Sequence, residues 1–216
     1  MISDKYKCIF IHIERTGGTS IERVLFGIGP DDKPNWTSSA GPKHISAKAA
    51  KKQFGNKRWN DYFKFSIVRN PWDLVVSNYF FPWFHNGEHG KVVDFKTWLL
   101  RWRNEPAWRN SINSNKVPQL NAISIKNRIA MDYIIRFETL NEEWKEVAKK
   151  IGAKDIIPNN WSHRLLRNPW LKDRRAYPYY YDKETKAIVA RRFKKDINYF
   201  GYKFGENIIT KKSYKG

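Results

Sequence analysis

A short apolar run that leads into a pair of glycines restricts the fold of this chain more than any other feature. Residues 8–13, Cys-Ile-Phe-Ile-His-Ile, are β-branched and aromatic, a composition typical of a buried strand. Gly17 and Gly18 interrupt the pattern, because glycine permits turns that other residues resist. Apolar residues at helical spacing follow: Ile21, Val24 and Leu25. The segment predicts a strand, a glycine-rich turn and a helix.

The same alternation continues along the chain. Residues 63–68 and 131–137 predict two more strands, and residues 46–54 predict a short helix. Residues typical of helix starts and ends are Asn70 with Pro71, Asp94, Gly152 and Asp182, the last of which opens a final helix through Val189, Phe193 and Ile197. Alternating strands and helices favour a parallel α/β sheet flanked by helices. We predict a single domain over residues 1–216, with its core in roughly residues 5–205 and a basic C-terminal tail.

The charge of the chain predicts an anionic partner. There are 41 Lys and Arg residues against 21 Asp and Glu, a formal net charge of +20. Such an excess fits a nucleic acid, a membrane surface, a phosphorylated cofactor or an acidic polymer.

Cysteine content and hydropathy restrict the cellular compartment and the partners that we expect for the protein. Cys8 is the only cysteine, which excludes an intrachain disulfide and a zinc finger and favours a reducing compartment. No apolar run approaches the roughly 20 residues that cross a bilayer, and the first residues do not form a signal peptide. We therefore expect a cytoplasmic protein with no membrane partner and no bound metal.

The first candidate site is the segment Arg15-Thr16-Gly17-Gly18-Thr19-Ser20, between the first strand and its helix. Glycines let successive backbone N–H groups face one anion, and the start of a helix adds its positive dipole end. Hydroxyls and an arginine fork complete an oxyanion cradle. An ordinary glycine turn with a Ser/Thr cap explains the glycines equally well. The spacing of a nucleoside-triphosphate P-loop and its lysine are absent.

The second candidate site pairs Arg69 with Ser77. Arg69 follows the strand at 63–68, at the edge where α/β sheets bind ligands, and Ser77 lies two helical turns further on. An arginine fork and a hydroxyl could bind one phosphate. If this pair is considered without the first segment, the more ordinary interpretation is that Arg69 lies on the surface and that Ser77 faces along its helix.

Together the two segments resemble the sulfotransferases, in particular the carbohydrate sulfotransferases that include the heparan 2-O enzymes and their small bacterial relatives. That family has a K-T-G-G-T-S-like loop after a strand and a later V-R-N-P-[WF]-x-x-x-x-S-x-Y segment. Here the matching residues are 15–20 and Val68-Arg69-Asn70-Pro71-Trp72 through Ser77 and Tyr79. Residues 135–140, Ile-Arg-Phe-Glu-Thr-Leu, and 196–204, Asp-Ile-Asn-Tyr-Phe-Gly-Tyr-Lys-Phe, are similar to two further family segments.

The resemblance implies a P-loop-like α/β fold and the donor 3′-phosphoadenosine 5′-phosphosulfate (PAPS), with 3′-phosphoadenosine 5′-phosphate (PAP) as product. Residues 15–20 would hold the 5′-phosphosulfate, and Arg69 and Ser77 the 3′-phosphate. Arg15 stands where the family has lysine. Arginine keeps the charge and can still stabilise the leaving phosphate, but it is longer and does not lose its proton, so the substitution bears on rate more than on binding.

A base that takes the proton of the acceptor hydroxyl is expected from the chemistry of sulfuryl transfer. His44 lies between the two segments, where similar family members have a catalytic histidine, and we assign it that role. A surface-loop histidine is the alternative. His12, in the first strand, is expected to be packed or hydrogen-bonded there, and His85 and His89 lie in a glycine-rich loop.

The resemblance implies a hydroxyl acceptor on a carbohydrate or small molecule. The positive charge suggests an acidic saccharide, and the nucleotide alone is the alternative explanation of that charge. Residues 164–175, which carry five Arg and Lys, fit either a solvated basic loop or a lid over the phosphates. Two other functions stay open: a nucleotide or small-molecule kinase with a degenerate phosphate loop, and a non-enzymatic nucleic-acid-binding protein. The kinase would need the missing lysine, and no helix-turn-helix, zinc or RNP signature supports nucleic acid as the partner.

Overall fold

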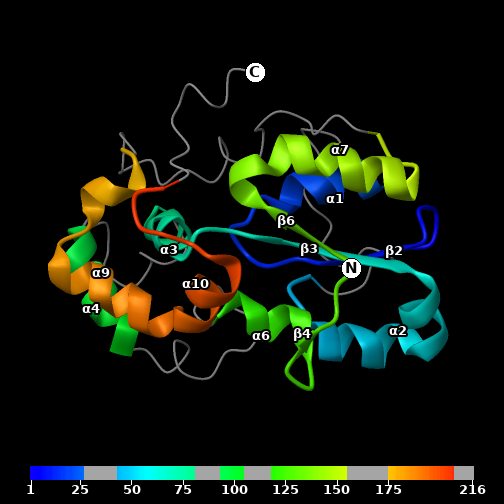
Figure 1. Ribbon diagram of the computed structural model, residues 1–216, viewed down its shortest axis with the longest axis horizontal. Helices are drawn as coiled ribbons and strands as arrows, with labels where there is room; N and C mark the ends of the chain where they lie inside the picture. Colours follow the sequence, from blue (N-terminus) through cyan, green and yellow to red (C-terminus); the bar gives the residue numbers. More distant parts are fainter. Residues whose placement is uncertain (27–42, 81–92, 105–117, 155–174, 207–216) are drawn as a thin grey trace.

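A four-stranded sheet forms the centre of the protein. The computed structural model describes residues 1–26, 43–80, 93–104, 118–154 and 175–206 (Figure 1). The strand order is β1-β2-β3-β6, with bounds Ile2–Ser3, Cys8–Ile11, Phe63–Val68 and Tyr133–Arg136. β2, β3 and β6 are mutually parallel, and β1 pairs antiparallel at the edge. The three parallel strands fall in the three segments that the sequence predicts, which confirms the parallel α/β sheet.

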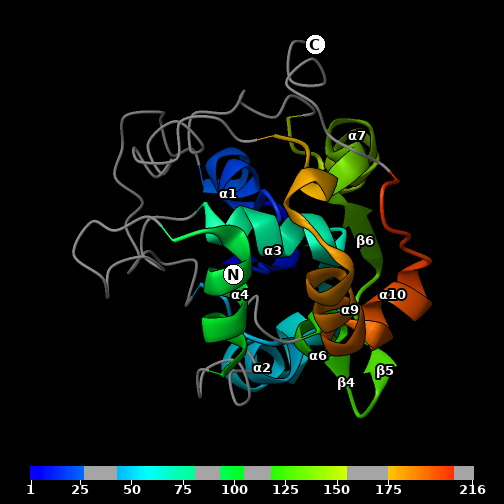
Figure 2. The same cartoon turned by 90° about the vertical axis from the view of Figure 1, so that its left-hand side faces the viewer.

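Helices cover both faces of this sheet. α1 (Gly18–Phe26) and α7 (Leu140–Ile151) lie on one face, and α2 (Ala47–Asp61) and α6 (Gln119–Ile123) lie on the other (Figure 1). Figure 2 looks onto the end of the molecule where α3 (Pro71–Tyr79) lies, beside α4 (Phe95–Asn104) and α9 (Lys183–Arg192). The remaining elements are short: β4 (Ser124–Ile125), β5 (Arg128–Ile129), η2 (Phe137–Thr139), η3 (Tyr177–Tyr180) and α10 (Lys194–Phe200).

The core has two halves because side chains alternate between the faces of a strand. Phe10, Phe65 and Ile67 point to the α1 and α7 face, where they pack with Trp144 in one cluster. Neighbouring residues of the same strands, such as Ile11, join the larger cluster on the opposite face. Full burial of each such side chain is worth about 1.5–3 kcal/mol, so the apolar strand residues fix the register of the sheet.

The predicted helix boundaries are confirmed where the sequence shows a cap. The side chain of Asn70 accepts from the N–H of Trp72, and Pro71 occupies the first turn. Asp182 forms a capping box, and Gly152 ends α7 in the left-handed conformation. Capping works here because these side chains satisfy N–H groups that the helix itself leaves unpaired.

Other boundaries differ from the sequence expectation. The helix expected over residues 46–54 runs on to Asp61, across a non-helical Gly55 at φ 83°. The last helix is divided into α9 and α10, because Phe193 leaves the helical conformation (φ −101°, ψ 23°). The sequence did not predict α6 or the β4–β5 hairpin. The basic tail lies largely outside the described residues.

The described residues contain neither a membrane-spanning helix nor a cluster of metal ligands. None of their helices combines the length and apolar character needed to cross a membrane. Within the same residues, no group of three or more His, Cys, Asp or Glu side chains is arranged to hold a metal ion.

Candidate functional site

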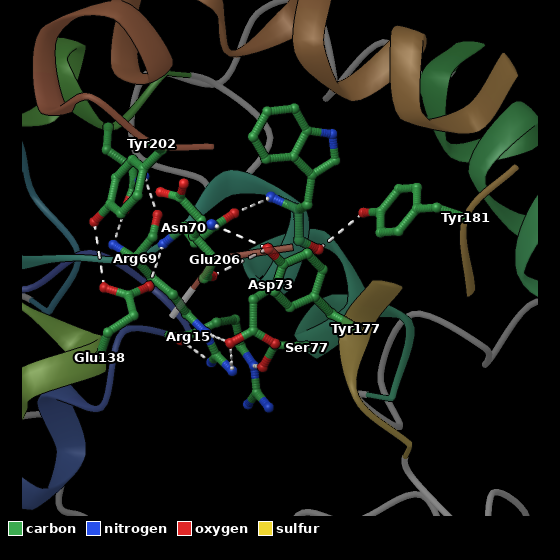
Figure 3. A network of polar contacts seen from close by, with 12 residues as sticks. Arg15, Arg69, Asn70, Asp73, Ser77, Glu138, Tyr177, Tyr181, Tyr202 and Glu206 are labelled. Carbon is green, nitrogen blue, oxygen red and sulfur yellow. Dashed lines mark hydrogen bonds and ion pairs between the residues drawn. The ribbon is translucent and has the colours of Figure 1, made fainter. Parts of the chain in front are cut away.

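The two segments singled out in the sequence meet at one edge of the sheet. β2 and β3 are parallel neighbours, so the residues that follow them leave the sheet on the same side. The Nη1 group of Arg69 donates to the backbone oxygen of Arg15 at 2.7 Å, and the Nε of Arg15 donates to the Oγ of Ser77 at 3.2 Å (Figure 3). The segments are therefore joined by direct hydrogen bonds.

The backbone of residues 15–18 has the shape of an anion cradle. φ is positive at Arg15 (63°) and Gly17 (86°) but not at Thr16 between them. Alternating backbone conformations of this kind turn successive N–H groups toward one side, and α1 begins at Gly18 immediately afterwards. The cradle and the positive end of α1 together suit a phosphate or sulfate group.

Packing around the two glycines explains why no side chain fits there. A Cβ on Gly17 would lie 3.0 Å from atoms of both Phe137 and Leu140. A Cβ on Gly18 would overlap the ring of His12. The turn is pressed between the ring of Phe137 and the ring of His12, and the backbone alone can face a ligand at these positions.

The hydroxyl residues of the cradle take different positions. Thr16 is fully buried, and its Oγ1 donates to the backbone oxygen of Ile13 at 2.7 Å, so this hydroxyl braces the loop. Thr19 is partly exposed, whereas Ser20 is buried and its N–H donates to the Gly17 oxygen at 3.0 Å. Of the expected ligands, Thr16 has its hydroxyl committed within the protein.

Arg69 is 1% exposed and lies deep in the site. Its Nε and Nη2 bind the Oδ2 of Asp73 at 2.8 and 2.7 Å, and its guanidinium lies 4.0 Å from the centre of the Phe137 ring. A buried cation needs such partners, because an unpaired charge in this position would cost several kcal/mol. A guanidinium has five N–H donors, and the contacts of Arg69 to Asp73 and Arg15 occupy three of them.

The backbone at Arg69 is held from the other side by Gln119. The Oε1 of Gln119 accepts from the Arg69 N–H and its Nε2 donates to the Arg69 oxygen, both at 2.8 Å. This side-chain amide continues the strand pairing for one residue past the end of β3. Asp196 of α10 in turn accepts from the N–H groups of Gln119 (2.6 Å) and Leu120 (3.0 Å).

Asn70 is fixed by residues from distant parts of the chain (Figure 3). Its N–H donates to Glu138 at 2.6 Å, and its Nδ2 donates to the Tyr177 hydroxyl at 3.3 Å and to the Lys203 oxygen at 3.2 Å. The hydroxyl of Tyr202 approaches Glu138 at 3.5 Å. The segment after α10 therefore closes over the start of α3.

Burial shifts the pKa of several of these supporting groups. It raises the pKa of Asp196 to about 6, although the N–H groups of residues 119 and 120 pull it down. It also raises the pKa of Glu138, against the hydrogen bond from Asn70, and that of the Tyr177 hydroxyl to about 12. These groups lie behind Arg69 and Asn70, and their contacts organise the backbone there.

His44 lies at the other flank of the cradle, next to His12. Its Nδ1 is 3.2 Å from the backbone oxygen of His12, and the two rings are 4.4 Å apart between centroids. A carbonyl oxygen only accepts, so Nδ1 carries the hydrogen and Nε2 of His44 keeps its lone pair. Burial, reinforced by His12, lowers the pKa of His44 to about 3, so the ring is neutral at pH 7.

The structure brings residues 15–20, Arg69 and Ser77 together at one edge of the sheet, where the sequence pattern predicts the two segments, and His44 lies beside them. His12 lies directly after β2, and its ring forms a hydrogen bond with Glu22. His85, His89 and residues 164–174 lie outside the described residues.

Sequence reasoning missed the supporting residues. Asp73 had a readable signal, because it stands four residues after Arg69 on the same helix start. Gln119 contacts residue 69 across 50 positions of sequence, and no local pattern assigns it to the site. Glu138 contacts residue 70 across 68 positions, and its signal was its place in the family-like segment 135–140, which received no role.

A model of the sulfotransferase family matches residues 1–203, which include both segments and nearly all of the segment at 196–204. Neither the curated proteins nor the solved structures contain a match.

Proposed function

The chain belongs to the sulfotransferase family, and on this premise we propose that it moves a sulfuryl group from PAPS to a hydroxyl of a carbohydrate acceptor. In this proposal residues 15–20 hold the 5′-phosphosulfate, Arg69 and Ser77 bind the 3′-phosphate, and His44 is the base. PAP is the product that leaves.

The observation that carries the donor assignment is the hydrogen bond from Arg69 Nη1 to the Arg15 oxygen. It joins the two candidate segments directly, which supports the binding of one adenosine bisphosphate by both of them. Arg69 also keeps two of its five N–H donors outside its contacts with Asp73 and Arg15, which suits a phosphate beside it. No side chain fits at Gly17, so only backbone groups can face a ligand there. Backbone N–H groups are donors that suit the phosphosulfate.

The donor supplies an activated sulfuryl group, and the residues of the site supply position and charge. His44 takes the proton of the acceptor hydroxyl at Nε2, the nitrogen that its contact with His12 leaves available. Arg15 and the amides of the cradle stabilise the negative charge that develops on the departing phosphate oxygen. Hydrogen bonding to Ser77 holds the Arg15 side chain at this point.

Thermal-shift measurements with PAP, AMP, ADP and ATP test the donor class. At a hundred times its dissociation constant, a ligand stabilises a protein by about 2.7 kcal/mol. For a chain of this size that corresponds to a rise in Tm of about 5–10 °C. PAP should give this rise and AMP a much smaller one. Equal shifts for PAP and AMP would refute a 3′-phosphate site, and a shift only with ATP and Mg²⁺ would favour the kinase alternative.

Replacing His44 with alanine tests the base. We expect kcat to fall about 10²- to 10⁴-fold, the usual contribution of a positioned base, while the PAP-induced shift in Tm stays. The assay is PAP release in the presence of an acceptor. Unchanged turnover by a folded H44A variant would remove His44 from the mechanism.

The acceptor is proposed as an acidic saccharide because a net charge of +20 attracts anionic partners. PAP release should be measured with neutral and uronate-containing oligosaccharides at two salt concentrations. Preference for the acidic sugars that weakens with salt supports the proposal, because salt screens such attraction. Preference for neutral sugars at both concentrations would contradict it.

A further inference from the structure

His44 belongs to a buried cluster of four ionisable side chains. His12 follows β2, Glu22 belongs to α1, and Lys43 and His44 precede α2. His12 Nδ1 is hydrogen-bonded to Glu22 Oε1, and the ammonium of Lys43 contacts the other oxygen of Glu22 at 2.7 Å. The side chains of His12 and Glu22 are each 3% exposed, and that of Lys43 is 10% exposed.

Opposite charges lie side by side in the cluster before any reaction. Burial favours a neutral Glu22, but His12 and Lys43 outweigh it and bring the pKa of Glu22 down to about 2. Burial lowers the pKa of His12, although the neighbouring carboxylate acts to raise it. The Glu22 carboxylate therefore faces the ammonium of Lys43 on one side and the ring of His12 on the other.

Proton transfer during the reaction would add one positive charge to the cluster, at a defined atom. As the acceptor oxygen forms its bond to sulfur and the bond from sulfur to the phosphate oxygen breaks, the electron pair leaves with the phosphate. The acceptor's proton goes to Nε2 of His44, which makes that ring a cation. His12 and the ammonium of Lys43 face it, whereas Glu22 is the carboxylate that favours its protonated form.

We propose that Glu22 is a positioning residue for this reaction, which holds the His12–His44 pair in place and stabilises the positive charge that forms on His44. The inference rests on the proposed function, because it assumes that His44 is the base. The chain of contacts is continuous: Glu22 fixes the ring of His12, that ring packs against the ring of His44, and the His12 oxygen fixes Nδ1 of His44.

Because Lys43 carries the opposite charge to Glu22, removing the two charges singly and together tests the proposal. Glu22→Gln keeps a hydrogen-bond acceptor for His12 but removes the negative charge beside Lys43, so His44 becomes harder to protonate. Lys43→Met has the opposite effect on His44, and the double variant is neutral again. The matched control is Glu146→Gln, the same chemical change on an exposed residue of α7.

Each variant is assayed for kcat, for KM of the donor and for kcat as a function of pH. E22Q should lower kcat at pH 7.5 at least tenfold, leave KM for the donor within twofold, and move the acidic limb of the profile to lower pH. K43M should move that limb to higher pH without loss of kcat at pH 7.5. The double variant should recover most of the kcat that E22Q loses, and E146Q should match the wild type.

Two results would overturn the proposal. One is an E22Q variant with kcat within twofold of the wild type and an unshifted profile. The other is a double variant as impaired as E22Q, which would give Glu22 a packing role only. Should E22Q fail to fold, K43M and the double variant still decide the question through the direction of the shift.

A separate measurement distinguishes this inference from the proposed function. NMR titration of the imidazole nitrogens of His44 should give the pKa order E22Q, wild type, K43M, from lowest to highest. That order does not depend on sulfuryl transfer. If the wild type neither binds PAP nor transfers sulfate, the proposed function fails. The order of the pKa values then still upholds or refutes the influence of Glu22 and Lys43 on the charge of His44.

Discussion

Replacing Gln119 with methionine tests how the backbone at Arg69 is held. Methionine has a similar length and volume but cannot pair with the N–H and oxygen of Arg69, which Gln119 binds at 2.8 Å each. Gln119 and Arg69 are both 1% exposed, so water does not replace the lost partner. Each buried polar group left unpaired costs about 1–3 kcal/mol, and we expect the free energy of unfolding to fall by about 2–5 kcal/mol in all.

The assay is urea denaturation together with thermal shift. A loss of this size lowers the Tm of a chain of this length by about 5–15 °C. The PAP-induced shift should fall more than the AMP-induced shift, because the perturbation lies at Arg69. Asn121→Met, on the exposed side of the same helix, should change stability by less than about 0.5 kcal/mol. A Q119M variant that loses less than about 1 kcal/mol would refute the reasoning.

Three further predictions concern the same site. Asp73→Ala leaves the Arg69 guanidinium buried without its carboxylate, and denaturation should show a loss of about 3–5 kcal/mol. The pKa of Asp196 is raised to about 6 in the folded protein, so its contribution to stability is full below its ordinary pKa of about 3.8 and is lost as pH rises through 6. Denaturation at pH 4 and pH 7.5 should therefore show the wild type losing roughly 3 kcal/mol relative to Asp196→Asn, and an equal difference at both pH values would contradict this. Gly18→Ala pushes a methyl group into the ring of His12, and thermal shift should show a less stable protein with a weakened PAP response; a variant that responds like the wild type would show that the ring moves aside at no cost.

Features with a local sequence signal could be predicted. Asn70 followed by Pro71 gives the start of α3, and the glycine pair gives the turn before α1, because capping and backbone freedom depend on neighbouring residues. The parallel strands were predictable for a similar reason, since each is a short apolar run. The position of Arg69 beside Arg15 followed from the topology of parallel neighbours.

Features that depend on distant partners could not be predicted. α6 has five residues and no side-chain cap of its own, and Asp196, 77 positions later, accepts from its first N–H. The break at Phe193 likewise has no proline or glycine to signal it. The contact between His12 and Glu22 joins the end of a strand to the second turn of a helix, and its geometry depends on how α1 packs on the sheet.

The hydrogen bond from Asn70 to the backbone of Lys203 joins residues 133 positions apart, and this has a consequence for biosynthesis. A ribosome releases the chain from its N-terminal end, so the segments at residues 15–20 and 69–77 emerge long before the residue that closes over α3. Contacts of such long range form late, since the intervening chain must first be ordered. The nascent protein therefore completes the contacts around Asn70 only after residue 203 has left the ribosome.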